Sequence, residues 1–323
     1  MRYFITGIGG FAGTHLAARL LEDGHDVQGL VRERRRYTGL LELAARHPRF
    51  DVGSLACGDV ADADGMMRVM AEARPDGVFH LAGIAFVPRA ESDPGLALTV
   101  NALGSRYVMA AVHRVAPASR VVVVGSADVY GAAAETGLPI EESCALRPVS
   151  TYGLSKAAAD MAAFQQWWET GLAVIRARAF NHTGPGQSAD FVCSDFARQV
   201  ARIERGAAPP VLRVGNLQSA RDFSDVRDIV RGYAVLMERG TPGEAYNLCS
   251  GETVTIAAIV DGLRAEIRVP FAVVEESTRV RRREIPRVVG NAARAHALGW
   301  TPTLPLRQTL RDLLNYWRRA TDV

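Results

Sequence analysis

Near its N-terminus the chain reads Arg2-Tyr3-Phe4-Ile5-Thr6-Gly7-Ile8-Gly9-Gly10-Phe11-Ala12-Gly13. The run Arg2–Thr6 is typical of a short buried strand, and the glycines after it predict a tight turn into a helix that ends near Gly24. The turn Gly7–Gly13 fits either Gly-x-x-Gly-x-x-Gly or Gly-x-Gly-x-x-Ala. In both forms the glycines let the backbone pass close to a pyrophosphate that rests on the N-terminus of the helix. Tight strand–helix turns also use glycine, but a strand before the motif and a helix after it favour nucleotide binding.

Strands and helices alternate through the first half of the chain. A second strand, Val27–Val31, follows the first helix, and Val121–Val124 is typical of a strand buried on both faces. Further apolar runs, separated by helix-like stretches such as Asp62–Ala73 and Asn101–Val115, lie at Val52–Ala56, Val78–Ala82, Val121–Gly125 and Ala173–Arg178. This alternation predicts an α/β fold with a doubly wound parallel sheet, the Rossmann arrangement, and helices on both faces.

The pattern changes after residue 180, where glycine and proline become frequent and strands become shorter. We therefore predict a nucleotide-binding domain at residues 1–179 and a smaller, mostly helical lobe at residues 180–323. A segment near residues 218–240 is expected to return to the first domain through the helix Val226–Glu238.

Composition narrows the class of protein. The 323 residues are 48% hydrophobic and 23% charged, which is ordinary for a soluble protein with a large core. The net charge of +3 gives no reason to expect binding to nucleic acid or membranes. No apolar run approaches the roughly 20 residues of a membrane span, and the first strand begins too early for a signal peptide. The widely spaced Cys57, Cys144, Cys193 and Cys249 form no metal or redox pattern, so we predict a cytoplasmic protein without a metal site.

The end of the second strand bears on the choice of cofactor. NAD sites usually carry an acidic residue there, which binds the ribose 2′-hydroxyl. Here the strand ends Leu30-Val31-Arg32, and an arginine suits a 2′-phosphate. A solvent-facing Arg32 is the alternative. The sequence therefore favours NADP(H) over NAD.

Three residues suggest acid/base chemistry. Tyr152 and Lys156 are four residues apart, so on a helix both side chains lie on one face. A tyrosine of pKa near 10 is a poor acid or base at neutral pH, and an adjacent ammonium favours the phenolate. Ser126 follows the strand Val121–Gly125, at the edge where open α/β sheets place their ligands. Alone, the Tyr–Lys spacing would more often be an exposed helix pair.

On this fold and in this order, Ser126, Tyr152 and Lys156 resemble the short-chain dehydrogenase/reductase family. The length and the second lobe resemble its extended branch, the NAD-dependent epimerase/dehydratase family, which acts on sugar nucleotides. In that family the tyrosine is the acid/base, the lysine holds the nicotinamide ribose and lowers the tyrosine pKa, and the serine hydrogen-bonds the reacting oxygen. The segments His80–Gly83 and Asn101–Gly104 share the resemblance. It implies cofactor contacts at Gly7, Gly10, Phe11, Gly13, Arg32, Asp59, Val60, Leu81, Ala82, Gly83, Asn101, Tyr152 and Lys156.

The stretch Phe180–Ser188, together with residues 215–217 and 221–228, looks closest to the GDP-6-deoxy-4-keto-mannose reductases that form GDP-D-rhamnose. It is similar, less closely, to the GDP-mannose 4,6-dehydratases. The resemblance implies that Asn181 and Arg221 contact the diphosphate or sugar, and that Arg281 and Glu284 face the nucleotide. Arginines suit phosphate oxygens. As isolated charges these residues would be surface groups.

The two activities place different demands on the site. A 4,6-dehydratase needs acid/base groups besides the tyrosine, and that branch carries Thr-x-Glu where this chain has Ser126-Ala127-Asp128. The shorter Asp128 sets its carboxylate back, and a misplacement on the order of 1 Å can lower a rate about 100-fold. Against this, the arginine-rich run Arg32–Gly39 looks more like the dehydratases, where such a loop touches a neighbour's cofactor site.

We therefore predict NADPH-dependent reduction of the C4 ketone of GDP-4-keto-6-deoxy-D-mannose to GDP-D-rhamnose, with Asp128 as a further catalytic candidate. A GDP-mannose or GDP-heptose 4,6-dehydratase with tightly bound NADP is the alternative. A non-catalytic nucleotide-binding protein would be expected to lose Ser126, Tyr152 or Lys156. The family commonly pairs through its long helices, here Asn101–Val115 and Tyr152–Thr170, so the resemblance implies a homodimer. The arginine-rich run would extend it to a homotetramer.

Overall fold

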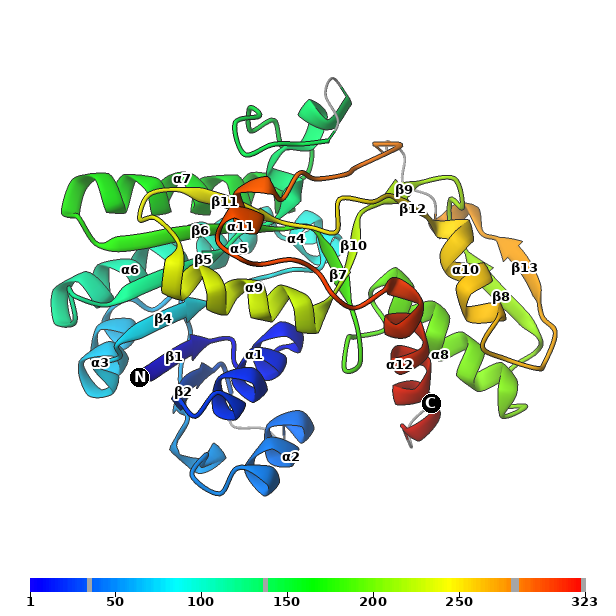
Figure 1. Cartoon of the computed structure of the whole chain (residues 1–323), viewed down its shortest axis with the longest axis horizontal. Helices are drawn as coiled ribbons and strands as arrows, with labels where there is room; N and C mark the ends of the chain where they lie inside the picture. Colours follow the sequence, from blue (N-terminus) through cyan, green and yellow to red (C-terminus); the bar gives the residue numbers. More distant parts are fainter. Residues whose placement is uncertain (34–36, 136–138, 280–284, 321–323) are drawn as a thin grey trace.

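The computed structural model describes residues 1–33, 37–135, 139–279 and 285–320. Within these residues the larger sheet has seven strands, all parallel, in the order β11-β6-β5-β4-β1-β2-β3 (Figure 1). These strands are β1 (Arg2–Thr6), β2 (Asp26–Val31), β3 (Ala56–Cys57), β4 (Gly77–His80), β5 (Arg120–Val124), β6 (Ala173–Ala179) and β11 (Ala245–Leu248). The predicted doubly wound parallel sheet is confirmed.

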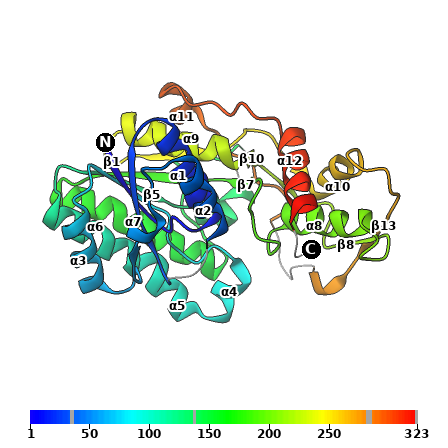
Figure 2. The same cartoon turned by 90° about the horizontal axis from the view of Figure 1, so that it is seen from below.

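Helices cover both faces of this sheet, as Figure 2 shows. One face is covered by α1 (Phe11–Glu22), α9 (Val226–Arg239) and α11 (Ala293–Ala297), and the other by α3 (Ala63–Ala73), α6 (Gly104–Val115) and α7 (Thr151–Thr170). Consecutive strand residues therefore enter opposite cores: Val122 lies in the core under α1 and α9, whereas Val121 and Val123 lie in the core under α3 and α6. This explains why β5 reads as an uninterrupted valine run.

Two strand predictions need correction. The predicted strand Val52–Ala56 is wrong, because Val52–Ser54 forms a 3₁₀ turn and the strand begins only at Ala56. The Asp51 side chain accepts a hydrogen bond from Gly53 N (2.8 Å), which favours a turn over a strand. Strand β11 was not predicted, although it pairs with β6 along the sheet edge. Helix α9, which corresponds to the predicted helix Val226–Glu238, packs against β5 and β6.

The second lobe has a separate hydrophobic core and lies to one side of the sheet (Figure 1). Its core is built mainly from α8 (Val192–Glu204), α10 (Ile256–Arg264), α12 (Leu306–Arg319) and the parallel pair β8 (Val211–Val214) and β13 (Ala272–Glu275). Two short strand pairs link the lobe to the sheet: β7 (Asn181–Thr183) with β10 (Phe223–Asp225), and β9 (Ala220–Arg221) with β12 (Val254–Thr255).

Shorter helices complete the described chain. They are α2 (Thr38–Arg46), α4 (Val87–Ser92), α5 (Pro94–Leu98), a π-helical turn at Thr99–Leu103 and 3₁₀ turns at Ala127–Val129, Gly131–Glu135 and Ser277–Arg279. None of the helices in the described ranges combines the length and apolar character needed to cross a bilayer.

Candidate active site

The order of strands changes direction between β1 and β4, and open α/β sheets bind ligands beyond the carboxyl ends of strands at such a point. Thr6 and His80 are paired at these two carboxyl ends. The chain then continues on one side into the turn Gly7–Gly13 and on the other into Leu81–Gly83. Leu81 N donates to Thr6 O (3.2 Å), so the two turns start side by side.

Glycine is required in the first turn for steric reasons. Gly7 has a φ of +74°, and a Cβ there would lie 2.9 Å from Ala82 Cα. A Cβ on Gly13 would lie 2.9 Å from Ile8 Cα. Gly10 begins α1 without a side-chain cap, and the first turn of α1 carries no acidic residue. Backbone N–H groups therefore remain to bind an anion, and the cradle fits a pyrophosphate.

The other predicted cofactor contacts lie around the same edge of the sheet. Arg32 follows β2 directly and is exposed, and the Cys57 thiol donates to Arg32 O (3.6 Å). Asp59 follows β3 and accepts from Ala61 N (2.9 Å). Val60, in contrast, is a core residue whose side chain lies where a Cβ on Gly104 would be. The Val60 side chain is therefore committed to the core.

Asn101 is buried and bonded entirely within the protein. Its Nδ2 donates to Ile84 O (3.0 Å) and Ser155 Oγ (2.8 Å), and its Oδ1 accepts from Ile84 N (2.8 Å). The side chain thus ties the segment after β4 to helix α7. Asn101 also leaves no room for a side chain at Gly83, whose added Cβ would lie 2.7 Å from Asn101 Oδ1.

A buried polar chain that the sequence reasoning missed runs beneath this edge. His80 Nδ1 lies 2.7 Å from Thr6 Oγ1, and His80 Nε2 lies 2.9 Å from Ser105 Oγ. Burial, with a smaller contribution from the charge of Lys156, lowers the pKa of His80 to about 3. His80 is therefore a neutral hydrogen-bonding link between β1, β4 and α6.

The start of α7 brings the predicted catalytic residues together. Ser150 caps the helix by accepting from Gly153 N (3.0 Å). A Cβ on Gly153 would lie 2.6 Å from Asp128 O, so glycine allows the helix to approach the turn that follows β5. Ser126 caps that turn, accepting from Asp128 N (3.2 Å), and hydrogen-bonds the Tyr152 side chain. Ser126 and Tyr152 therefore meet as the sequence predicted.

The electrostatics of this pair differ from the expectation. Burial, followed by the charge of Asp128, raises the pKa of Tyr152, while the hydrogen bond from Ser126 opposes the rise. Lys156 is buried, its Nζ donates to Val124 O (2.9 Å), and burial lowers its pKa to about 8. The expectation that Lys156 holds the Tyr152 pKa down is not met. In this structure Tyr152 keeps its proton.

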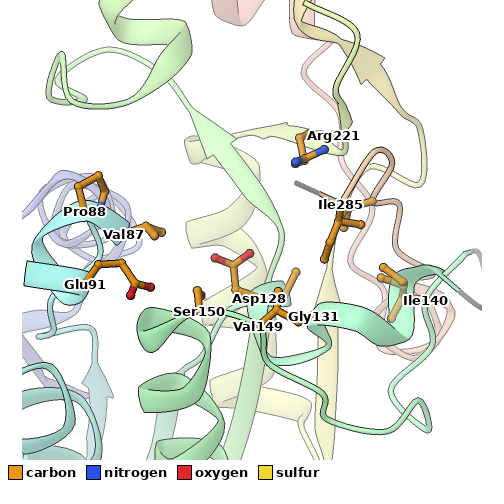
Figure 3. Close-up of a pocket in the computed structure, with 13 residues that line it drawn as sticks. Val87, Pro88, Glu91, Asp128, Gly131, Ile140, Val149, Ser150, Arg221 and Ile285 are labelled. Carbon is orange, nitrogen blue, oxygen red and sulfur yellow. The ribbon is translucent and has the colours of Figure 1, made fainter. Parts of the chain in front are cut away.

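A cavity of about 450 Å³ lies beside this centre (Figure 3). Three charged side chains enter it from separate segments: Glu91 from α4, Asp128 from the turn after β5 and Arg221 from β9. The remaining lining residues are mostly apolar: Val87, Pro88, Ala127, Gly131, Ala134, Ile140, Val149, Ser150, Ile285 and Val288. Such a mixture suits a ligand with an apolar edge, hydroxyl groups and an anionic end.

The predicted substrate contacts separate in the structure. Arg221 lines the cavity and its Nη1 donates to Ala220 O (2.9 Å). Asn181 is exposed at the start of β7 and is not among the cavity residues. Arg281 and Glu284 lie outside the described residues.

Asp222, next to Arg221, is a buried residue that sequence reasoning missed. Its carboxylate accepts from Ser250 N (2.7 Å), Gly251 N (2.9 Å) and Gly290 N (3.3 Å), although burial raises its pKa. It fixes two loops behind Arg221. Glu91 was missed as well, because no local motif marks either residue. Across the ranges that the structure covers, no group of three or more His, Cys, Asp or Glu side chains is placed to hold a metal ion.

Comparison with known proteins finds reductases and epimerases related over nearly the full length. A GDP-6-deoxy-D-mannose reductase from Pseudomonas aeruginosa is 35% identical over 98% of this chain and 97% of its own length. A structure of RMD from the same organism, complexed with NADPH, superposes with a TM-score of 0.84 at 34% identity and covers 98% of both chains. A putative epimerase from Burkholderia cenocepacia is 32% identical with a TM-score of 0.84, covering 99% of this chain and 98% of its own.

Dehydratases are also related over nearly the full length. A GDP-mannose 4,6-dehydratase from Vibrio cholerae is 25% identical over 96% of this chain and 92% of its own length. The sequence model described as GDP-mannose 4,6 dehydratase matches residues 4–313. The resemblance predicted from Ser126, Tyr152 and Lys156 is confirmed, and the chain belongs to the GDP-mannose 4,6-dehydratase family.

Proposed function

We propose that this chain is an NADPH-dependent reductase that converts the C4 ketone of GDP-4-keto-6-deoxy-D-mannose to the alcohol of GDP-D-rhamnose. The observation that carries the proposal is the Ser126–Tyr152 hydroxyl pair beyond β5, beside a cavity of about 450 Å³. It occurs in a chain 35% identical to a GDP-6-deoxy-D-mannose reductase.

The residues of the site fit a reduction. When bound, NADPH supplies the hydride that turns the C4 carbonyl oxygen into an alkoxide. The Ser126 hydroxyl donates a hydrogen bond to that oxygen, and Tyr152 gives it a proton. Burial and the charge of Asp128 keep this proton on Tyr152 until it is needed. A raised tyrosine pKa therefore favours reduction, in which the tyrosine begins as an acid.

In this proposal each of the two lobes binds one of the two ligands. Residues 1–179, with the segment near 218–240, bind NADP(H): the glycine turn takes the pyrophosphate, Arg32 the 2′-phosphate and Lys156 the nicotinamide ribose. Residues 180–323 bind the GDP-sugar. Arg221 in the cavity suits the diphosphate. Asn181 is assigned to the diphosphate or sugar, and Arg281 and Glu284 to the nucleotide, by family resemblance.

A 4,6-dehydratase acting on GDP-mannose or GDP-heptose is the second candidate. One observation favours it: the Asp128 carboxylate points into the cavity near Tyr152, where a dehydratase needs a further acid/base group. The dehydratase description of the matching family model agrees with it.

One pair of incubations separates the two candidates. The purified protein is first given GDP-mannose without added NADPH, and then GDP-4-keto-6-deoxy-D-mannose with NADPH. We expect no product in the first incubation, and equal amounts of oxidised NADPH and GDP-D-rhamnose in the second. Formation of a 4-keto-6-deoxy sugar in the first incubation would contradict the reductase proposal and show that the protein is a 4,6-dehydratase.

Tyr152→Phe tests the chemical role of the tyrosine. The variant keeps the buried ring but has no proton to give, so turnover should fall by at least about 100-fold, the usual range for a general acid. NADPH binding, followed by fluorescence titration, should remain within error of the wild-type protein. A large loss of NADPH affinity would instead make Tyr152 a binding residue.

We also propose a homodimer in the cytoplasm. The outer face of α7 carries exposed apolar side chains, which a second copy would bury. The four cysteines are free, as expected in a reducing compartment. Tetramer formation through the arginine-rich run remains an expectation from resemblance, since residues 34–36 of that run lie outside the described chain.

A further inference from the structure

Glu91 connects the cavity wall to the start of the catalytic helix. Its Oε1 accepts from Thr151 N (2.7 Å) and its Oε2 accepts from Thr151 Oγ1 (2.7 Å). Thr151 is the first residue of α7 and directly precedes Tyr152. Both oxygens of one carboxylate therefore hold one residue, at a separation of 60 positions in the sequence.

The helix that carries Glu91 also surrounds the Tyr152 ring. Tyr152 packs in a small buried cluster with Ile84, Ala90 and Ala97, and Val87 lies against it. Ala90 and Val87 belong to α4, the same short helix as Glu91. The ring of Tyr152 thus packs against α4, while Glu91 on the same helix holds Thr151, the residue before Tyr152 at the start of α7.

The start of α7 has two separate caps. Ser150 Oγ accepts from Gly153 N, and Glu91 accepts from Thr151 N, two residues earlier in the same first turn. A carboxylate at a helix N-terminus is also favoured by the helix dipole. Because Glu91 lines the cavity, a bound substrate would exclude water from this contact and strengthen it.

We propose that Glu91 is a positioning residue: its clamp on Thr151 holds Tyr152 at the distance from Ser126 and the cavity that proton transfer requires. This inference rests on the proposed function, because the rate it affects is that of the ketone reduction. Figure 3 shows the Glu91 carboxylate directed from α4 toward the start of α7 at Ser150.

The test compares Glu91→Ala, Glu91→Gln and Thr151→Val with the double variant Glu91→Ala/Thr151→Val. We expect Glu91→Ala to lower kcat by about 10- to 100-fold, as for a reacting group displaced by up to about 1 Å. The KM for the ketosugar should stay nearly constant. Glu91→Gln, which keeps an acceptor, should recover part of the loss. The double variant should be no slower than Glu91→Ala, because Glu91→Ala already removes both hydrogen bonds to Thr151, including the one from the hydroxyl that Thr151→Val removes.

A second readout does not depend on activity. Amide hydrogen exchange of a peptide covering residues 148–158 should speed up in Glu91→Ala, since the Thr151 N–H loses its acceptor. Glu72→Gln, at an exposed position in α3, is the matched control and should change neither kcat nor exchange.

Three results would overturn the inference. One is unchanged exchange at the start of α7 in Glu91→Ala. Another is a lower melting temperature with kcat and KM preserved, which would make the contact merely structural. The third is a higher KM in Glu91→Ala with Thr151→Val silent, which would make Glu91 a direct substrate contact. Failure of the proposed function is distinguishable, because the wild-type protein would then not reduce the ketone while the exchange test still applies.

Discussion

At the scale of single residues, the chemistry depends on where the proton of Tyr152 resides. The structure places a carboxylate, Asp128, close enough to raise the pKa of Tyr152, in addition to the effect of burial. A reductase gains from this arrangement because its tyrosine must begin protonated. An oxidation would begin with the phenolate, which Asp128 disfavours.

Asp128→Asn tests this electrostatic role. The substitution keeps the shape of the side chain and removes its charge, so the pKa of Tyr152 should fall. Since reduction requires protonated Tyr152, the alkaline limb of the kcat–pH profile should move to lower pH. Asp64→Asn, at an exposed position in α3, is the control and should leave the profile unchanged. Complete inactivity of Asp128→Asn at every pH would instead point to Asp128 as an essential acid/base.

Lys156 should make folding stability depend on pH. Burial lowers its pKa from the usual 10.5 to about 8, so between these values the unfolded chain binds the proton and the folded chain does not. The free energy of unfolding therefore rises with pH across that window, by up to about 1.4 kcal/mol per pH unit. Lys156→Met should lack this contribution.

Urea unfolding between pH 7 and pH 10 measures the effect as a difference between wild-type protein and Lys156→Met. Buried cysteines and tyrosines act in the opposite direction, because burial raises their pKa, to about 12 for Cys193. Both proteins contain these groups, so their contribution cancels in the difference. A difference that does not change with pH would mean that Lys156 is not desolvated in the folded protein.

At the scale of elements, a buried ion-pair network joins α7 to strands β6 and β11 of the sheet through Tyr130. Asp160, whose side chain is 1% exposed, receives Arg178 Nε and Nη2 (both 2.9 Å) and Arg176 Nη1 (2.7 Å). Burial alone would raise the pKa of Asp160, but the hydrogen bonds and charge of Arg178 outweigh it and lower that pKa. Arg178 Nη1 also donates to Tyr130 OH (3.0 Å), which in turn donates to Asn247 Oδ1 (2.7 Å) on β11.

Arg178→Ala should therefore destabilise the protein strongly. It leaves the buried Asp160 with fewer partners, and breaking such pairs lowers the free energy of unfolding by about 3–5 kcal/mol. Arg2→Ala is the control, since the Arg2–Asp76 pair is 51% and 36% exposed and such pairs contribute at most about 1 kcal/mol. Urea denaturation of both variants gives the comparison. Equal small effects would show that Arg176 alone neutralises Asp160.

The sequence predicted those elements whose signal lies in residues that are close together in the chain. The turn Gly7–Gly13, the valine run of β5 and the Tyr152–Lys156 spacing each carry their signal within a few neighbouring residues. Strand β11 carries no such signal: its four residues become a strand only through pairing with β6 and contacts such as Asn247 with Tyr130. The role of Glu91 could not be predicted either, because its partner Thr151 is 60 positions away and a single glutamate in a sequence carries no signal of its own.

At the scale of the whole molecule, two lobes complete one site. The domain built on the sheet supplies Ser126 from the turn after β5 and Tyr152 and Lys156 from α7, while β9 supplies Arg221 through a chain segment fixed by Asp222. The proposed reaction therefore requires both lobes to stay in place.

An apolar stripe on α7 identifies the surface that should associate. Leu154, Met161 and Trp168 recur every seven residues and are 50%, 63% and 75% exposed, and Phe164 between them is 42% exposed. Phe164 and Trp168 stack with ring centroids 6.4 Å apart, which forms a wide apolar surface. In a two-fold dimer the same stripe of each protomer would lie in the interface, so one substitution changes the interface at two places.

Met161→Glu should therefore weaken self-association by at least about 30-fold, the equivalent of about 2 kcal/mol at an interface hot spot. Sedimentation velocity over a range of protein concentrations measures the change. Met67→Glu is the matched control, because Met67 is a single exposed methionine on α3, 36% exposed and away from the stripe. Its sedimentation should match that of the wild-type protein. If the wild-type protein is monomeric at micromolar concentration, the dimer prediction is wrong. If both variants lose the dimer, the interface includes α3 and is not confined to the stripe on α7.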